Sequence, residues 1–240
     1  MQFRNPGAII EQTIRQNFMS DYFGASAKKD TLLDLGCGPR PYRNYYQPVF
    51  RRSIGAEHPS SPFPKSEIDI FCLATSIPLE DQSVDTVLCT EVMHDIAEPT
   101  EMLNEVFRVL KKDGELILTT PFVTPVVDGI YDHYRYTCYG LEYLLKKSGF
   151  EVIRIIPVGD VFASTITLWI KPWLKLFNVM AKKTGIKAIY SIYNPLMFIS
   201  TTLPQILYLM TRNLPVFKQL YARFSYGSIG YICQARKTTG

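Results

Sequence analysis

The sequence has few of the residues that bind metals or build disulfide frameworks. Its 240 residues include five cysteines and three histidines, and no two cysteines have Cys-x-x-Cys spacing. This absence excludes the common zinc and redox motifs. We therefore expect no metal site and the reduced thiols of a cytoplasmic protein. The first 24 residues carry charges throughout, and they lack the apolar core of a signal peptide.

Acidic residues are missing from the last third of the chain. Residues 1–160 hold all 22 Asp and Glu together with 16 Lys and Arg, whereas residues 161–240 hold ten Lys and Arg and no acid. Segregation of charge along a chain indicates an interaction surface in the basic part.

Charge of either sign is missing from Ala188 to Thr211, a run of 24 residues that is long enough to cross a bilayer. Polar residues and two prolines interrupt the run, so we predict a buried helical hairpin or an interfacial element. The preceding segment mixes aromatic and basic residues: Trp169, Lys171, Trp173, Lys175, Phe177, Lys182 and Lys183.

That mixture suits the headgroup level of an anionic membrane. Two other interpretations remain open. The segment could be a helical subdomain that packs on the rest of the protein or forms a dimer. Binding to nucleic acid is the less favoured one, because the basic residues are interleaved with long aliphatic runs.

Two glycines follow the first apolar strand of the chain, which we predict at Thr31–Leu35. Gly36 and Gly38 allow a tight turn and a close approach of the backbone to a ligand. A second strand, Ser53–Glu57, ends in an acid that lies 19 residues after Gly38. A carboxylate about 20 residues beyond a glycine turn can bind ribose hydroxyls. The pattern predicts a nucleoside-binding half of a doubly wound sheet.

Strands and helices alternate further along the chain, which implies parallel strands with right-handed crossovers. We predict strands near 68–73, 86–89, 115–120, 150–156 and 229–234, and helices at 100–110 and 139–148. Gly114 is expected to close the first helix, with Lys111 and Lys112 in its last turn. The expected division is a helical lid at 1–30, a core at 31–160, an apolar and basic helical insertion at 161–226, and a last strand and tail at 227–240.

Four segments in order resemble the class I S-adenosylmethionine-dependent methyltransferases, of the type 11-like small-molecule group. They are Asp34-x-Gly36-x-Gly38, residues 77–87, residues 91–96 and residues 103–118. The resemblance runs from about Thr31 to Ile156. It implies an α/β fold with a doubly wound, Rossmann-like, seven-stranded and mostly parallel sheet. The last strand would be antiparallel, and here the helical insertion precedes it.

The resemblance implies S-adenosyl-L-methionine as the cofactor and assigns its contacts. The turn formed by Gly36, Cys37 and Gly38 would bring backbone N–H groups to the methionine moiety. Asp34 would serve the ammonium group, and Glu57 would hold the ribose. The other expected contacts are Leu73 and Ala74 at the adenine, and Thr90 and Glu91 at the methyl-donor end.

Residues 131–137 resemble a segment of a bacterial subgroup that is associated with surface-glycan or lipid modification. In this segment His133 is the candidate base for a hydroxyl acceptor. Asp132 or Asp128 would orient it, and Arg135 would clamp a phosphate or carboxylate of the acceptor. The alternative is a structural ion pair between Asp132 and Arg135. His94 is a second candidate base.

The resemblance and the composition together predict O-methylation of an amphiphilic or lipid-linked small acceptor. The enzyme would be cytoplasmic and peripheral on the inner face of an anionic membrane. Two alternatives remain, which are a soluble small-molecule methyltransferase whose insertion forms a dimer interface, and a non-catalytic scaffold that binds S-adenosylmethionine.

Overall fold

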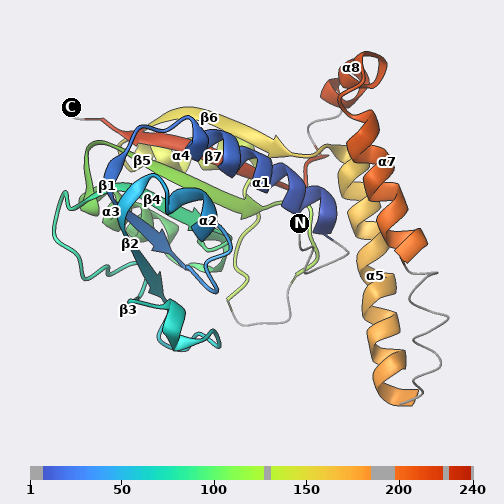
Figure 1. Ribbon diagram of the computed structural model, residues 1–240, viewed down its shortest axis with the longest axis horizontal. Helices are drawn as coiled ribbons and strands as arrows, with labels where there is room; N and C mark the ends of the chain where they lie inside the picture. Colours follow the sequence, from blue (N-terminus) through green and yellow to red (C-terminus); the bar gives the residue numbers. More distant parts are fainter. Residues whose placement is uncertain (1–7, 127–130, 185–197, 224–226, 239–240) are drawn as a thin grey trace. The chain divides into compact units, whose positions relative to one another are not determined.

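The computed structural model of the protein describes residues 8–126, 131–184, 198–223 and 227–238 (Figure 1). The chain separates into two compact units. The sheet unit comprises residues 16–122, 126–156 and 230–240, and the helical unit comprises the residues up to Arg15, residues 123–125 and residues 157–229. The predicted division of the chain into four parts, with boundaries at residues 30, 160 and 226, stays a prediction. The two compact units divide the chain in another way, because the first 15 residues belong with residues 157–229.

One seven-stranded sheet organises the sheet unit, in the order β3-β2-β1-β4-β5-β7-β6. Its strands are β1 (Lys29–Leu35), β2 (Phe50–Glu57), β3 (Ile70–Phe71), β4 (Val84–Thr90), β5 (Leu110–Pro121), β6 (Phe150–Val158) and β7 (Gly230–Lys237). Strand β1 pairs in parallel with β2 and β4, and β4 with β5, whereas β7 runs antiparallel to β5. The predicted fold class is therefore confirmed, including the antiparallel last strand.

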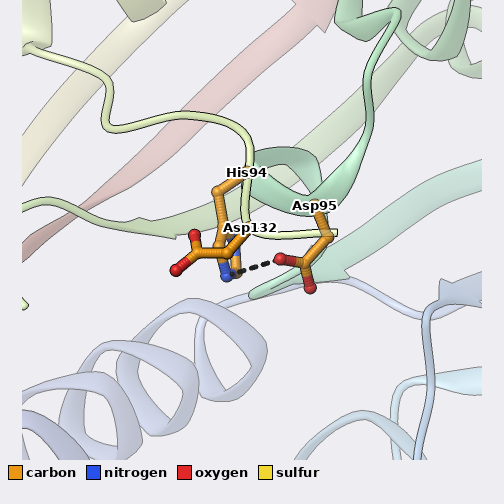
Figure 2. Close-up of side chains that lie close together, drawn as sticks. All are labelled: His94, Asp95 and Asp132. Atoms are coloured by element: carbon orange, nitrogen blue, oxygen red, sulfur yellow. Dashed lines mark ion pairs between the residues drawn. The ribbon is translucent and has the colours of Figure 1, made fainter. Parts of the chain in front are cut away.

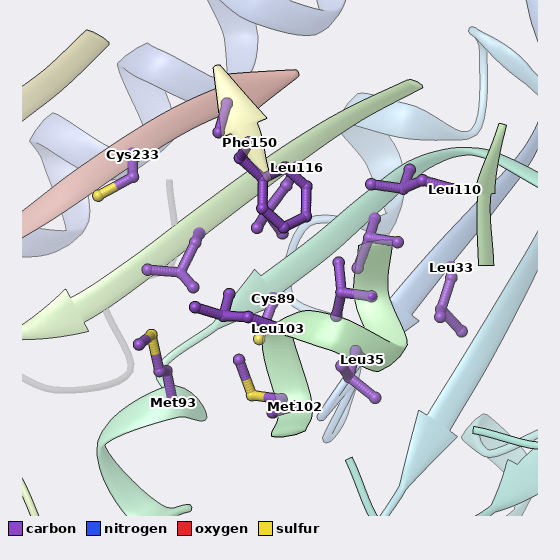
Figure 3. Close-up of a cluster of buried hydrophobic side chains, with 14 of the residues drawn as sticks. Leu33, Leu35, Cys89, Met93, Met102, Leu103, Leu110, Leu116, Phe150 and Cys233 are labelled. Carbon is purple, nitrogen blue, oxygen red and sulfur yellow. The ribbon is translucent and has the colours of Figure 1, made fainter. Parts of the chain in front are cut away.

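The central strands are apolar on both faces because helices cover both. On one face, α3 (Pro99–Val109) and α4 (Cys138–Lys147) pack on the sheet and close a large apolar core, which Figure 3 shows in part. Four residues of the apolar stripe of α3 are completely buried there: Met102, Leu103, Val106 and Val109. On the other face lie the C-terminal half of α1 (Ile9–Gly24) and the short α2 (Arg43–Tyr46). The Phe23 ring of α1 packs edge to face against the Tyr46 ring of α2.

The predicted end of helix α3 is wrong. The helix stops at Val109, and Lys111 and Lys112 already belong to β5. The register of β4 and β5 shifts there, so that residues 111–114 form an irregular bulge beside Val84 and Thr86. Gly114 is required for a different reason, because a Cβ atom at this position would lie 2.8 Å from the carbonyl oxygen of Lys111. The Lys111 Nζ binds the Asp85 carboxylate at 3.0 Å instead of a helix end.

The helical unit contains α5 (Val161–Thr184), the π-helical turn η4 (Phe198–Thr202), α7 (Leu203–Thr211) and α8 (Pro215–Arg223). Helices α5 and α7 lie side by side (Figure 1). Among the described residues no helix has the length and apolarity needed to span a membrane. Residues 188–197 of the uncharged run lie outside the described residues, as do the side chains of Trp173, Phe177, Lys182 and Lys183.

The first turn of α1 belongs to the helical unit. The backbone N–H groups of Ile9 and Ile10 donate to the Oε1 atom of Gln205 at 2.9 and 3.3 Å. Since the first N–H groups of a helix lack partners within the helix, this buried amide satisfies them. The lid function of residues 1–30 stays a prediction.

Candidate functional site

The glycine turn after β1 has the backbone geometry that its sequence predicts. Gly36 and Gly38 have φ angles of +69° and +49°, in the left-handed region that favours glycine. The N–H of Gly36 donates to the carbonyl of Ala56 at 2.9 Å, which ties the turn to β2. A Cβ atom at position 36 would lie 2.1 Å from the Val92 side chain. Both the conformation and the space therefore require glycine at this position.

Glu57 lies at the carboxyl end of β2, beside this turn. Its Oε2 atom accepts a hydrogen bond from the Gly38 N–H at 2.8 Å, and its Oε1 atom accepts one from the His58 N–H at 2.9 Å. Hydrogen bonds to an ionised carboxylate are stronger than those between neutral groups. The carboxylate is thus held against the glycine turn by two backbone donors.

A cavity of about 570 Å³ opens at the carboxyl edge of the sheet, within the sheet unit. Open α/β sheets bind their ligands at this edge. Of the residues predicted to form the site, six line the cavity: Gly36, Glu57, Leu73, Ala74, Glu91 and His133. The other predicted residues, all of them described, lie outside its lining: Asp34, Cys37, Gly38, Thr90, Asp132 and Arg135.

Asp34 is buried behind the glycine turn, with 2% of its surface exposed. Its carboxyl group accepts a hydrogen bond from the hydroxyl of Tyr46 at 3.1 Å. Burial raises the pKa of Asp34 from its ordinary value of 3.8 to about 7. That Asp34 binds the ammonium group of a ligand stays a prediction. The structure shows a buried hydrogen bond from the Tyr46 hydroxyl of α2 to the Asp34 carboxyl group.

Glu91 follows β4 in a strained backbone conformation. Its φ of +57° is uncommon for a residue other than glycine. Its N–H donates to the Thr119 carbonyl and its carboxylate accepts from the Thr119 hydroxyl, both at 3.0 Å. Strain of this kind persists only where the surroundings impose it, and it is concentrated at functional sites. Glu91 therefore presents an anchored carboxylate to the cavity.

Leu73 is about half exposed at the cavity wall. The neighbouring Cys72 donates its N–H to the Glu57 carbonyl at 2.9 Å, which fixes this wall to the end of β2. An exposed leucine in a cavity offers an apolar face to a flat ring. The predicted adenine contact through packing is compatible with this position.

Asp132 and Arg135 form a two-pronged ion pair, in which Nη1 pairs with Oδ1 and Nη2 binds Oδ2 at 2.6 Å. The hydrogen bond to Asp132 raises the pKa of Arg135 above its ordinary value. The carboxylate is almost buried, with 3% of the side chain exposed. The ion-pair alternative is thus the arrangement that the structure shows, and the acceptor clamp stays a prediction. Asp128, the other candidate to orient His133, lies outside the described residues.

Asp132 also gathers with His94 and Asp95, as Figure 2 shows. The Nε2 atom of His94 lies 3.2 Å from an Asp95 carboxylate oxygen. Burial and the nearby carboxylates of Asp132 and Glu91 raise the pKa of Asp95. In the described part of the chain these three side chains lie close enough to share a metal ion, but Arg135 already supplies a positive charge to Asp132.

His133 lines the cavity, and its backbone is anchored to the loop after β4. Its N–H and that of Tyr134 both donate to the His94 carbonyl, at 3.0 and 3.1 Å. This pair of hydrogen bonds positions the 131–134 loop beside η3 (Met93–Asp95). The candidate base therefore faces the same cavity as Glu57 and Glu91.

Three residues of the site's surroundings are not predicted by the motifs. Asp95 lines the cavity from η3, and Phe63 covers it from the loop after β2, where its ring edge would lie 3.3 Å from a Cβ at Gly38. Arg40 adopts a φ of +48° and is nearly buried. Its guanidinium lies across Gly55, binds the Glu67 carbonyl at 2.6 Å and pairs with Asp69.

Comparison with known proteins agrees with this geometry. The Methyltransferase domain family matches residues 33–118. A "Probable S-adenosylmethionine-dependent methyltransferase" of Mycolicibacterium smegmatis is 31% identical over 97 residues, which are 38% of this chain and 37% of that protein. The chain spans well under half the length of the first curated relatives that it matches.

Solved structures share the fold at low sequence identity. The geranyl diphosphate C-methyltransferase of Streptomyces coelicolor, in complex with S-adenosyl-L-homocysteine, has a TM-score of 0.57 and 14% identity and covers 94% of this chain and 76% of its own. The phosphoethanolamine N-methyltransferase 2 of Haemonchus contortus, in complex with S-adenosyl-L-methionine, has a TM-score of 0.54 and 13% identity and covers 95% and 53%. The sheet order, the glycine turn and the family match over residues 33–118 together make this part of the chain similar to the class I S-adenosylmethionine-dependent methyltransferases.

Proposed function

We propose that this protein transfers the methyl group of S-adenosyl-L-methionine to an oxygen atom of an amphiphilic or lipid-linked small acceptor at a membrane surface. One observation carries the catalytic part of the proposal. The glycine turn after β1 and the anchored carboxylate of Glu57 meet at one cavity, at the carboxyl edge of the sheet.

The residues at this edge fit the cofactor. Gly36 and Gly38 keep the turn free of side chains, and Glu57 presents carboxylate oxygens that can accept hydrogen bonds from ribose hydroxyls. Leu73 and Ala74 offer an apolar wall for the adenine. The cavity volume of about 570 Å³ lies within the range of small-molecule and cofactor sites.

The cofactor supplies an activated sulfonium methyl, so the protein's task is to align the acceptor and to exclude water. A hydroxyl acceptor must lose its proton near the transition state. His133 lines the cavity and is the base that we propose for this step. The Asp132–Arg135 ion pair and the hydrogen bonds from the loop to His94 hold the segment that carries His133.

Titration calorimetry with S-adenosyl-L-homocysteine tests the cofactor site. We expect the wild-type protein to bind at micromolar concentration and Glu57→Ala to bind at least about tenfold more weakly, since a hydrogen bond to a charged group is worth about 1.5–3 kcal/mol. Glu151→Ala, at an exposed position of β6, is the matched control and should bind as the wild type does. Unchanged binding by Glu57→Ala would refute the assignment of Glu57. A substitution of Gly36 is a less suitable test of cofactor binding. Any side chain at this position would collide with Val92 and disturb the turn even without the cofactor.

Turnover with a panel of hydroxylated lipid-linked glycans tests the base. His133→Ala should lower turnover by about 100-fold or more, the usual contribution of a general base, while the affinity for S-adenosyl-L-homocysteine stays the same. The control is Tyr139→Ala, which changes an exposed aromatic residue of α4. Equal turnover by His133→Ala and the wild type would remove His133 as the base.

A further inference from the structure

Helix α7 turns its polar side chains inward. Gln205 and Tyr208 are buried, as are Thr201 and Thr202 of the preceding turn. The Gln205 Nε2 donates to the Thr201 carbonyl at 2.7 Å, and the Tyr208 hydroxyl donates to the Asp160 carboxylate at 2.9 Å. Gln205 also accepts a hydrogen bond from the backbone N–H of Ile9 in the first turn of α1. The polar face of α7 is therefore held by hydrogen bonds inside the helical unit.

The opposite face of α7 is apolar and exposed. Its large side chains, including that of the turn before the helix, are 39–67% exposed: Ile199, Leu203, Ile206, Leu207 and Met210. Their spacing of four, three, one and three residues places them on one stripe of a helix. A surface helix in water normally has the opposite polarity, so this face, which we call the α7 apolar face, is built to meet an apolar medium.

The charges of the helical unit identify that medium. The unit's two acids are engaged within it, Glu11 in an ion pair with Arg15 at 2.9 Å and Asp160 in its hydrogen bond with Tyr208. Residues 161–229 have no acid, and exposed cations stand on α5 and α8 at Lys175, Lys218 and Arg223. A second copy of the chain packed through this same face would bring the same cations against one another. An anionic bilayer surface complements them and also receives apolar side chains.

We propose that the α7 apolar face docks in the interface of an anionic lipid bilayer, with Lys218 and Arg223 at the headgroups. The helix lies on the membrane and does not span it, in keeping with its nine residues. This inference deepens the proposed function, because it names the surface that would bring the enzyme to a lipid-linked acceptor.

Flotation of the full chain with vesicles tests the docking without cofactor or acceptor. We expect the wild type to float with vesicles of phosphatidylcholine and phosphatidylglycerol in a 3:1 ratio. The double variant Leu207→Glu, Met210→Glu should reduce the bound fraction at least tenfold. The double variant Tyr139→Glu, Tyr143→Glu, which places the same two charges at exposed positions of α4 in the sheet unit, should float as the wild type does.

The charge variants Lys218→Glu and Arg223→Glu should each weaken binding about fivefold or more on anionic vesicles, since one basic residue near such a surface contributes about 1 kcal/mol. Binding to pure phosphatidylcholine should be weak in all variants. Circular dichroism and S-adenosyl-L-homocysteine titration verify that each variant is folded.

Flotation of the Leu207 and Met210 double variant at the wild-type level would overturn the proposal. A second result would also overturn the proposal. In it, neither protein floats with vesicles, the wild type is a dimer on size-exclusion chromatography, and the double variant is a monomer. Failure of the cofactor titration would count against the methyltransferase site and leave the flotation result standing, so the two proposals fail separately.

Discussion

A carboxyl group buried behind the glycine turn should make the protein less stable at mildly alkaline pH. Asp34 is 2% exposed, and burial raises its pKa from 3.8 to about 7. Because the folded state binds this proton more tightly than the unfolded state, the stabilisation is complete below about pH 4 and is lost as the pH rises through about 7. With these two pKa values, the free energy of unfolding falls by about 2 kcal/mol between pH 5.5 and pH 8 through this group alone.

Asp34→Asn isolates that contribution, since the amide oxygen can still accept the Tyr46 hydrogen bond but the side chain cannot ionise. Urea denaturation of both proteins at pH 5.5 and pH 8.0 gives the four free energies of unfolding. We expect the stability of the variant relative to the wild type to rise by about 2 kcal/mol from the lower to the higher pH. Groups common to both proteins cancel in this difference. Asp113→Asn, at an exposed position, should show no such change. Parallel pH profiles of the Asp34 variant and the wild type would refute the reasoning.

Four further substitutions test the contacts that position the site and the helices. Asp69→Ala should destabilise the protein by about 3–5 kcal/mol, because it leaves the buried Arg40 without its acid. Arg40→Met should lower the free energy of unfolding by only about 1–2 kcal/mol, because the remaining Asp69 carboxylate is half exposed and can be hydrated. Thermal denaturation that finds Arg40→Met less stable than Asp69→Ala would contradict this. Thr137→Ala removes the side chain that caps α4 through the Gly140 N–H at 3.1 Å, so chemical denaturation should show a loss of about 1 kcal/mol, and none would count against the cap. Gln205→Leu leaves the first N–H groups of α1 without their acceptor, and hydrogen exchange of residues 9–12 should accelerate at least tenfold; unchanged protection would remove that role.

The central strands were predictable because their burial leaves a local pattern. Strand β4 is covered on both faces and its centre, Val87 to Cys89, is continuously apolar, so this part was predicted correctly. The end of α3 was not, since a glycine after two lysines is typical of a helix end. In the structure this glycine serves a bulge between β4 and β5, where a Cβ atom would lie 2.8 Å from the Lys111 carbonyl oxygen and 3.2 Å from the Asp85 carbonyl oxygen of the neighbouring strand. The contact with β4 depends on strand pairing and leaves no local pattern.

The candidate site divides in the same way. Gly36 and Glu57 belong to one βαβ unit, where the fixed geometry of turn and crossover makes the spacing informative. Asp95 reaches the cavity from the short helical turn η3 and Phe63 from an irregular loop. The paths of both segments follow tertiary packing, so sequence spacing carries no such information for them. Arg40 stands next to the motif, but its role depends on Asp69, which is 29 residues away in the sequence.

Helix α7 shows why a periodic pattern alone cannot assign a surface. Its sequence gives one apolar and one polar stripe, and the same period describes a helix with either stripe buried. Polar residues in the uncharged run argued against a membrane span, but they did not reveal which face is inside. The Asp160 carboxylate and the N–H groups of α1 decide this, because each needs a buried partner and finds it in Tyr208 and Gln205. Satisfying these groups from inside leaves the aliphatic stripe of α7 outside, so the polarity that we propose to match a bilayer is a consequence of buried hydrogen bonding in the helical unit.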